Sequence, residues 1–279
     1  MAAQDEPDVT VFRGWKESGK YVWSPYVTKL EARFRFADVR YATDVGSIRA
    51  APKGKVPYVE CRNLSPVRGS STVQEESSRP RTLLSDSALI IETLIKWGVL
   101  PDLNRDLEPS KRSHDMALRA QLEDKLYFYH TWERWTQNYY VMRDHVLWAI
   151  PYLVRVLIGL LIYRNTLATL HGQGTGRFTA EEIAAFRRDI WEGLSSLLIT
   201  SRSSSSTNKK SNSGDGPFWI LGGDYPTEAD ACLFGFIVSV LVCTAAPDSQ
   251  EVVKSHPILL DYASRIHDRY FPDYEKWMA

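Results

Sequence analysis

In the first part of the chain, apolar positions alternate between the short period of strands and the longer period of helices. The β-branched and aromatic run at 9–12 predicts a strand. Pro25 directly after Ser24 is typical of a helix start, and this helix is expected to continue toward Val39. The same reasoning predicts three more strands and then a helix, at 39–42, 56–61, 81–84 and 87–97. The elements therefore follow the order strand–helix–strand and then strand–strand–helix.

The remainder of the chain follows the helical period. Leu118, Leu122 and Leu126 recur at a spacing of four residues, which places them on one face of a helix. This helix is expected to continue through the aromatic stretch 127–140, and more helices are predicted in the ranges 141–170, 180–198, 227–244 and 256–269. The change of pattern divides the chain into an α/β domain, residues 1–100, and an all-α domain, residues 101–279.

Three segments interrupt this scheme. Residues 62–80 and 201–216 are polar, rich in Ser and without an apolar period, so both are predicted to be loop insertions. Residues 146–163 form an apolar run that is almost long enough to span a membrane. Pro151 and Arg155 lie inside it, and an arginine in the middle of a membrane helix is costly. We therefore expect a buried helix hairpin or a core helix here, with peripheral membrane contact as the alternative.

Composition and charge narrow the function classes. The 279 residues include 34 basic and 34 acidic side chains, so there is no general positive surface for nucleic acid. The three cysteines form no CxxC pair and the six histidines show no metal-ligand spacing, which argues against a disulfide framework and against a metal site. Residues 1–8 contain three acidic residues and no apolar run, so the expected location is the cytoplasm.

Three short motifs stand at the ends of predicted elements: Ser-Pro-Tyr at 24–26, Lys-Val-Pro at 55–57 and Ser-Asp-Ser at 85–87. Together with the element order, they resemble the thioredoxin-like architecture of cytosolic glutathione transferases. Longer segments resemble the failed-axon-connections and metaxin-like branch of that superfamily: APKGKVPYVE at 51–60, SDSALIIETL at 85–94, ERWTQ at 133–137, HGQGTGRFTAEEI at 171–183 and GGDYPTEADACLFG at 222–235. The resemblance implies a thioredoxin-like βαβ–ββα N-terminal domain and an all-helical glutathione-transferase-type C-terminal domain.

The resemblance also implies a glutathione site built from these motifs. Ser24 would contact the glutathione sulfur, where the start of its helix favours the thiolate. Val56, before a cis Pro57, would pair with the cysteinyl backbone of glutathione like an added strand. The residues by themselves leave a simpler interpretation open, because Ser24 can be an ordinary helix cap and Pro57 an ordinary strand start.

The two ends of glutathione are assigned by the same resemblance. Asp86 would bind the ammonium of the γ-glutamyl group and Ser87 its carboxylate, although such a pair is also an ordinary helix cap. Lys53 and Lys55 are by position the nearest cations for the glycyl carboxylate, with exposed lysines as the alternative. Lys55 belongs to the Lys-Val-Pro motif and is the one we assign to the site.

Aromatic residues are the candidates for a second-substrate pocket. Trp132, Trp135 and Tyr139 of the helical domain would line it, together with Tyr26 of the first motif. An aromatic stripe at helical spacing is also typical of core packing. The pocket assignment therefore depends on where the helices place these rings.

These residues predict a glutathione-transferase-like enzyme that adds the glutathione thiolate to an electrophilic, aromatic small molecule. Ser24 stands where thiol-transferring relatives carry Cys, which disfavours disulfide chemistry. The alternatives are a biosynthetic isomerase or dehydratase on the same fold, with or without glutathione as cofactor, and a non-catalytic metaxin-like adaptor. The expected partners are glutathione and a hydrophobic electrophile, and a homodimer is the usual state of the superfamily.

Overall fold

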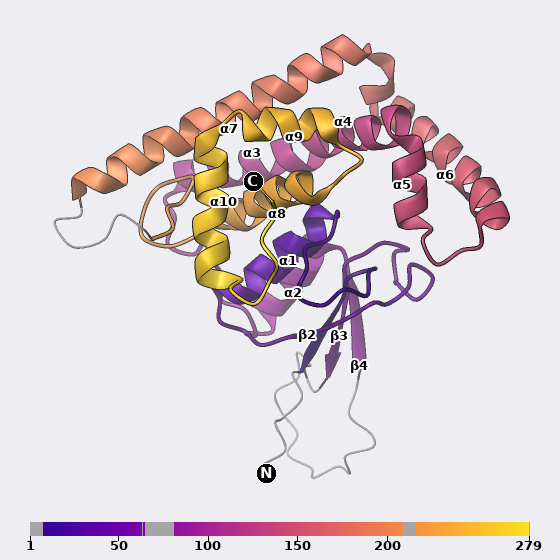
Figure 1. The fold of residues 1–279 in the computed structure, drawn as a ribbon. Coiled ribbons are helices and arrows are strands. Elements are labelled where there is room, and N and C mark those ends of the chain that lie inside the picture. The colour runs from indigo at the N-terminus through magenta and orange to yellow at the C-terminus, as the bar shows by residue number, and fades with distance from the viewer. Residues whose placement is uncertain (1–7, 63, 65–80, 209–215, 279) are drawn as a thin grey trace, which may run out of the picture.

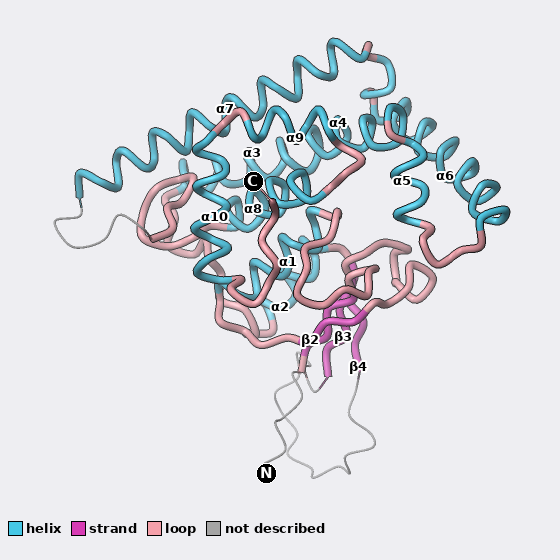
Figure 2. The backbone as a smooth tube through the Cα atoms, in the orientation of Figure 1, coloured by secondary structure: helices cyan, strands magenta, loops and turns pink. Residues whose placement is uncertain are grey.

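The computed structural model of this chain describes residues 8–62, 64, 81–208 and 216–278 (Figure 1). Most of the predicted insertion at 62–80 lies outside these residues, as do residues 209–215 of the second polar segment. The described part confirms the predicted fold class: a small mixed sheet with helices, followed by a region made of helices (Figure 2).

Four strands form one sheet, in the order β2-β1-β3-β4. They are β1 (Val9–Phe12), β2 (Ala42–Asp44), β3 (Tyr58–Arg62) and β4 (Arg81–Ser85). β1 runs parallel to β2 and antiparallel to β3, and β3 runs antiparallel to β4. In this register Val11 lies opposite both Thr43 and Val59. The sheet therefore has the strand order and directions that a βαβ–ββα unit produces.

The second strand begins later than predicted, because the end of the preceding helix reaches further along the chain. Helix α1 spans Pro25–Phe36. After it, Asp38 adopts a positive φ of 53° and the backbone N–H of Val39 donates to the carbonyl of Phe34. Val39 thus still belongs to the helix end, and the strand predicted at 39–42 is wrong in its position. The other three strands lie within two residues of their predicted bounds.

Helices α1 and α2 (Ser87–Lys96) cover the sheet through one apolar cluster. Strands, helices and the turn after α2 contribute to it: Val9, Val11, Leu30, Phe34, Val59, Cys61, Ile90, Ile91, Leu94 and Leu100. Burial of these side chains fixes the direction of both helices. Because both helices begin at the same edge of the sheet, this packing brings Ser24 and Asp86, which precede them, to the same end of the domain.

The remaining elements are helices. Their bounds are α3 (Pro109–Ala120), η2 (Gln121–Leu126), α4 (Tyr127–Trp132), η3 (Glu133–Gln137), α5 (Tyr139–Val146), α6 (Tyr152–Gln173), η4 (Thr175–Arg177), α7 (Ala180–Asn208), α8 (Glu228–Val242), α9 (Pro247–Lys254) and α10 (Pro257–Tyr270). The elements α3 to η3 follow one another directly, and η2 and η3 are π-helical turns within that run.

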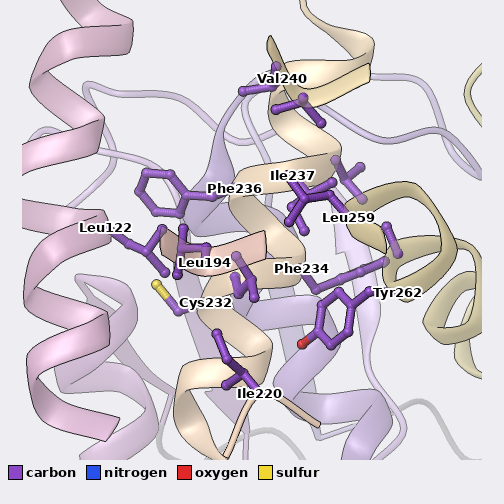
Figure 3. Packing of buried hydrophobic residues seen from close by; sticks show 14 of the residues in the cluster. Leu122, Leu194, Ile220, Cys232, Phe234, Phe236, Ile237, Val240, Leu259 and Tyr262 are labelled. Atoms are coloured by element: carbon purple, nitrogen blue, oxygen red, sulfur yellow. The ribbon is translucent and has the colours of Figure 1, made fainter. Parts of the chain in front are cut away.

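Helix α8 is the centre of the main apolar core. All its residues from Glu228 to Leu241 are buried. Leu122 of η2, Leu194 of α7 and Leu259 of α10 belong to the cluster around it (Figure 3). A helix that is apolar on every side is stable only when other helices surround it, as they do here.

Helix α1 packs directly on α8, and this contact joins the sheet-bearing unit to the helical body. Two ion pairs of α1 reinforce the junction. Arg33 Nε lies 2.7 Å from Glu228 of α8, and Lys29 Nζ lies 2.5 Å from Glu123 of η2. Gly235 lies at the crossing, where an added Cβ would meet the Pro25 carbonyl oxygen at 2.5 Å. The absence of a side chain at 235 therefore lets the two helices approach closely.

Two expectations about the helical part are wrong. Residues 201–208, predicted as a loop, continue helix α7. Residues 152–161, predicted to be buried, form the first half of α6, which projects from the helical body (Figure 1). Most of its apolar side chains are exposed. The side chains of Leu153, Leu157 and Leu161 are 80%, 67% and 67% exposed. Among the described residues, α6 is a helix that is long enough and apolar enough to cross a membrane, judged by length and composition alone.

Candidate active site

A cavity of about 490 Å³ opens between the N-terminal ends of α1 and α2, the start of β3 and the run of helices from η2 to α5. The cavity is lined by Trp15, Trp23, Ser24, Pro25, Tyr26, Ile48, Gly54, Lys55, Val56, Pro57, Asp86, Ser87, Glu123, Asp124, Tyr127, Phe128, Thr131, Arg134, Trp135 and Met142. All three motifs singled out in the sequence thus contribute to one cavity. We call this cavity the cleft.

Ser24 lies at the N-cap position of α1, with extended backbone angles of −83° and 115°. Its side chain makes no capping hydrogen bond, so the simpler interpretation of Ser24 as a helix-capping side chain is not what the structure shows. The hydroxyl stays available to a molecule in the cleft. The N–H groups of the first helical turn point in the same direction and favour negative charge there.

The Val56–Pro57 peptide bond is cis. Within the described part of the chain, neither the N–H nor the carbonyl of Val56 has a backbone partner, because pairing in β3 begins only at Tyr58. Val56 can therefore pair with an extended peptide placed in the cleft, in the manner of strand addition. Lys55 lies beside Val56 in the cleft wall. Lys53, the other candidate cation, is not among the residues that line the cleft.

Asp86 is the N-cap of α2. Its Oδ1 accepts hydrogen bonds from the backbone N–H groups of Ala88 and Leu89, at 3.1 and 3.3 Å. Capping is therefore part of its role, as the simpler interpretation held. Asp86 also has a φ of 78°, a conformation that costs a non-glycine residue energy and that recurs at functional sites. Ser87 follows it, buried in the cleft wall.

The opposite wall of the cleft comes from the helical body. Tyr127, Phe128 and Thr131 of α4, Trp135 of η3 and Met142 of α5 form its largely apolar part. Together with Ile48 and Pro25 on the facing side, these residues make a surface suited to a flat apolar molecule.

Tyr26 lies between the two walls. Its ring contacts those of Tyr127 and Phe236, with centroids 5.1 and 6.1 Å away. Burial raises the pKa of its phenol well above the usual value. Tyr26 therefore acts as a neutral wall residue, and Ser24 remains the hydroxyl available at the helix start.

Two of the four predicted pocket aromatics do not line the cleft. Trp132 packs against the main core cluster instead. Tyr139 contacts the rings of Tyr140 and Tyr163, and Arg143 lies over it. Of the four predicted residues, the structure therefore places Tyr26 and Trp135 in the cleft lining, and Trp132 and Tyr139 outside it.

Several lining residues were not predicted. Trp23 precedes Ser24 directly, so its position in the sequence was a usable signal. Arg134 lies in the ERWTQ segment at 133–137, which carried the resemblance without indicating a role for the arginine. Trp15 and Glu123 carried no signal, because tertiary packing alone brings them to the cleft. Glu123 enters from the π-helical turn η2, where its Oε1 accepts from Lys29 and from the Cys232 thiol.

With this geometry established, comparison with known protein families gives two matches. The family model described as "Glutathione S-transferase N-terminal domain" matches residues 25–142. The family model described as "Glutathione S-transferase, C-terminal domain" matches residues 216–266. The first range begins one residue after Ser24 and contains the rest of the three motifs and most of the cleft wall. Together the two ranges cover more than half of the chain.

Individual relatives agree with these matches. Failed axon connections of Drosophila melanogaster is 24% identical over an alignment of 270 residues. The alignment covers 91% of this chain, and the chain spans about 56% of that relative's length. Among solved structures, a glutathione transferase from Phanerochaete chrysosporium has a TM-score of 0.55 and 15% identity, with 98% of this chain and 99% of that one covered.

Two further solved structures were determined with glutathione bound. A glutathione transferase family member from Pseudomonas fluorescens has a TM-score of 0.53 and 12% identity, covering 97% of this chain and 92% of that one. Ure2p has a TM-score of 0.52 and 13% identity, covering 96% and 93%. The sheet order, the helical body, the two domain matches and these relatives lead to one conclusion: the chain belongs to the glutathione S-transferase superfamily, and it resembles the branch that contains Failed axon connections.

Proposed function

We propose that this protein binds glutathione in the cleft and adds its thiolate to an electrophilic, aromatic small molecule. The observation that carries the proposal is the meeting of Ser24, Val56 and the Asp86–Ser87 pair around one cavity. The glutathione-bound relatives of the same fold support it.

The proposed position of glutathione follows from the groups in the cleft. The free backbone groups of Val56 pair with the cysteinyl residue. Asp86 uses Oδ1 for the cap, which leaves Oδ2 for the ammonium of the γ-glutamyl group, and Ser87 at the start of α2 takes its carboxylate. Lys55 is the cation for the glycyl carboxylate.

In the proposed reaction, the Ser24 hydroxyl donates a hydrogen bond to the glutathione sulfur. The start of α1 stabilises the same negative charge, so the thiol loses its proton more readily. The thiolate then attacks the electrophile held against Trp135 and the α4 residues, and a carbon–sulfur bond forms. A proton from solvent completes an addition; where the electrophile carries a leaving group, that group departs with the displaced electron pair.

Calorimetric titration with glutathione tests this proposal. The wild-type protein is expected to bind, and Ser24→Ala is expected to bind while raising the pKa of the bound thiol. Asp86→Asn keeps an oxygen for the helix cap and removes the negative charge, so a loss of binding in this variant shows that the charge recognises the ligand. Failure of the wild-type protein to bind millimolar glutathione would sink the proposal.

A second candidate function is favoured by a different observation. The exposed apolar side chains of α6 form a surface of the kind that mediates docking, as expected of a non-catalytic adaptor on this fold. The two candidates predict different results in the same titration. An adaptor without a glutathione site gives no binding heat in the wild-type protein, whereas the enzyme does.

A further inference from the structure

Arg134 lies in the wall of the cleft and is buried, with 6% of its surface exposed. Its Nη1 donates to the carbonyl oxygen of Trp23 at 3.0 Å, and its Nη2 donates to the Ser239 hydroxyl at 3.0 Å. That hydroxyl in turn donates to the Trp23 carbonyl at 2.7 Å. The guanidinium is therefore fixed against the peptide that leads into Ser24.

The charge of Arg134 is not balanced within the described part of the chain. Four other buried arginines there, Arg13, Arg33, Arg143 and Arg187, each lie within ion-pair distance of a carboxylate. Arg134 has no such partner among the described residues, and its buried Nε has no hydrogen-bond acceptor.

Neighbouring groups do not supply the missing negative charge. Glu133, the preceding residue, turns to Arg187 and Ser249. Burial lowers the pKa of His130 and of His145, to about 4 for His145, and the positive charge of Arg134 adds to both shifts. Burial likewise raises the pKa of the Cys243 thiol, so that the thiol is neutral.

The carboxylates of the cleft do not bind Arg134 either. Glu123 is engaged by Lys29, Asp86 caps α2, and Asp124 makes no ion pair with Arg134. A buried cation without a counter-charge is costly, and in a cleft that cost is recovered when an anion binds.

We propose that Arg134 is an anion-binding residue of the cleft, whose charge neutralises a negative group held beside Ser24. This inference rests on the proposed function and deepens it. The anion has two sources: the thiolate of glutathione, or a carboxylate on the second substrate. Trp15, whose buried Nε1 also lacks an acceptor, lines the same cleft and can donate to the same group.

The first arm of the test measures the pKa of the bound thiol by its ultraviolet absorbance. If the anion is the thiolate, Arg134→Gln raises this pKa by about one unit or more, because an opposite charge at close range shifts a pKa by that amount. Ser239→Ala removes one bond that positions Arg134 and keeps the charge, so it is expected to raise the pKa less than Arg134→Gln does. Arg188→Gln, at an exposed position, controls for net charge.

The second arm compares ethacrynic acid with its methyl ester, which lacks the carboxylate. If the anion is on the second substrate, Arg134→Gln raises KM at least tenfold for the acid and leaves KM for the ester unchanged. Arg134→Lys, which retains a positive charge, is expected to recover part of either effect and also covers the case in which the glutamine variant does not fold.

The third arm needs no glutathione and separates failure of this inference from failure of the proposed function. The probes are anilinonaphthalene sulfonate and the neutral N-phenylnaphthylamine. Arg134→Gln is expected to weaken binding of the sulfonate at least fivefold relative to the neutral dye. If the wild-type protein does not bind glutathione but Arg134→Gln still changes the dye selectivity, the proposed function is wrong and the anion site stands. Unchanged thiol pKa, unchanged KM ratio and unchanged dye selectivity would together overturn the inference.

Discussion

At the scale of single residues, the cleft borders a histidine whose charge state the fold controls. The ring of His145 lies between two tryptophans, nearly parallel to Trp23 with centroids 3.4 Å apart and 5.2 Å from Trp15. Burial first, and the charge of Arg134 second, lower its pKa to about 4. The neutral ring is therefore the form that packs between the tryptophans at neutral pH.

This histidine makes stability depend on pH. In the unfolded chain its pKa is about 6.5, so the unfolded state binds a proton that the folded state does not, between about pH 6.5 and about pH 4. The free energy of unfolding is expected to fall as the pH is lowered through that window. His145→Phe keeps an aromatic ring in the stack and cannot titrate, so its urea-unfolding curves should show a weaker pH dependence. Identical slopes in both proteins would contradict the assignment.

At the scale of elements, the close crossing of α1 and α8 holds the cleft in shape. Ser24 precedes α1, and α1 is fixed to the helical body by this crossing and by its buried ion pairs. A change that separates the two helices therefore also moves one wall of the cleft against the other. The residue that permits the crossing is Gly235, since its missing side chain leaves room for the α1 backbone.

Gly235→Ala is expected to lower the free energy of unfolding by about 1–3 kcal/mol, because the new methyl group meets backbone atoms of Pro25 and Lys29 that cannot yield. Gly193→Ala in α7 is the matched control. A Cβ at 193 meets nothing within 4 Å, so the better helix propensity of alanine should stabilise the protein by about 0.5–1 kcal/mol. Chemical denaturation measures both, and equal effects would show that the crossing tolerates a side chain.

At the scale of the whole molecule, the apolar surface is distributed unevenly. The main core around α8 consists of buried side chains, whereas the first half of α6 presents aliphatic side chains to the outside. Arg155 does not interrupt this surface, because its guanidinium donates back to the carbonyls of Trp148 and Ile150. The exposed side chains therefore contribute to the surface properties of the molecule and little to its folding.

Leu157→Gln together with Leu161→Gln is expected to change the free energy of unfolding by no more than about 0.5 kcal/mol, because both side chains are mostly exposed. Leu170→Ala in the same helix serves as the comparison. Its side chain is 1% exposed, and its truncation should cost about 2–5 kcal/mol. Urea unfolding distinguishes the two positions, and a large loss from the double glutamine variant would show that α6 is covered in solution.

The π-helical turn η3 explains why one of the two predicted pocket tryptophans lines the cleft and the other does not. Trp132 and Trp135 are three residues apart and would share one face of a regular α-helix. The π-helical turn η3 begins between them, at Glu133, and the wider turn rotates the residues that follow. Trp135 therefore enters the cleft while Trp132 packs in the core. Such a turn leaves no mark in the apolar periodicity.

What the sequence determined by itself is the order of the elements of the sheet-bearing part and the starts of those that carry a local signal. These depend on local chemistry: the fixed φ of Pro25, the β-branched run at 9–12 and the Asp86 cap act within a few residues. The division of the chain at residue 100 remains a prediction of the same kind.

Only the tertiary structure decided which polar and apolar groups were left without partners. Within the described part of the chain, the Ser24 hydroxyl makes no capping bond and Arg134 has no ion-pair partner. Both facts, like the exposure of the leucines of α6, depend on what lies beside these side chains in space. Residues far apart in sequence supply those neighbours, as Ser239 does for Arg134. Hydropathy records whether a side chain prefers burial, whereas packing against distant segments decides whether it is buried.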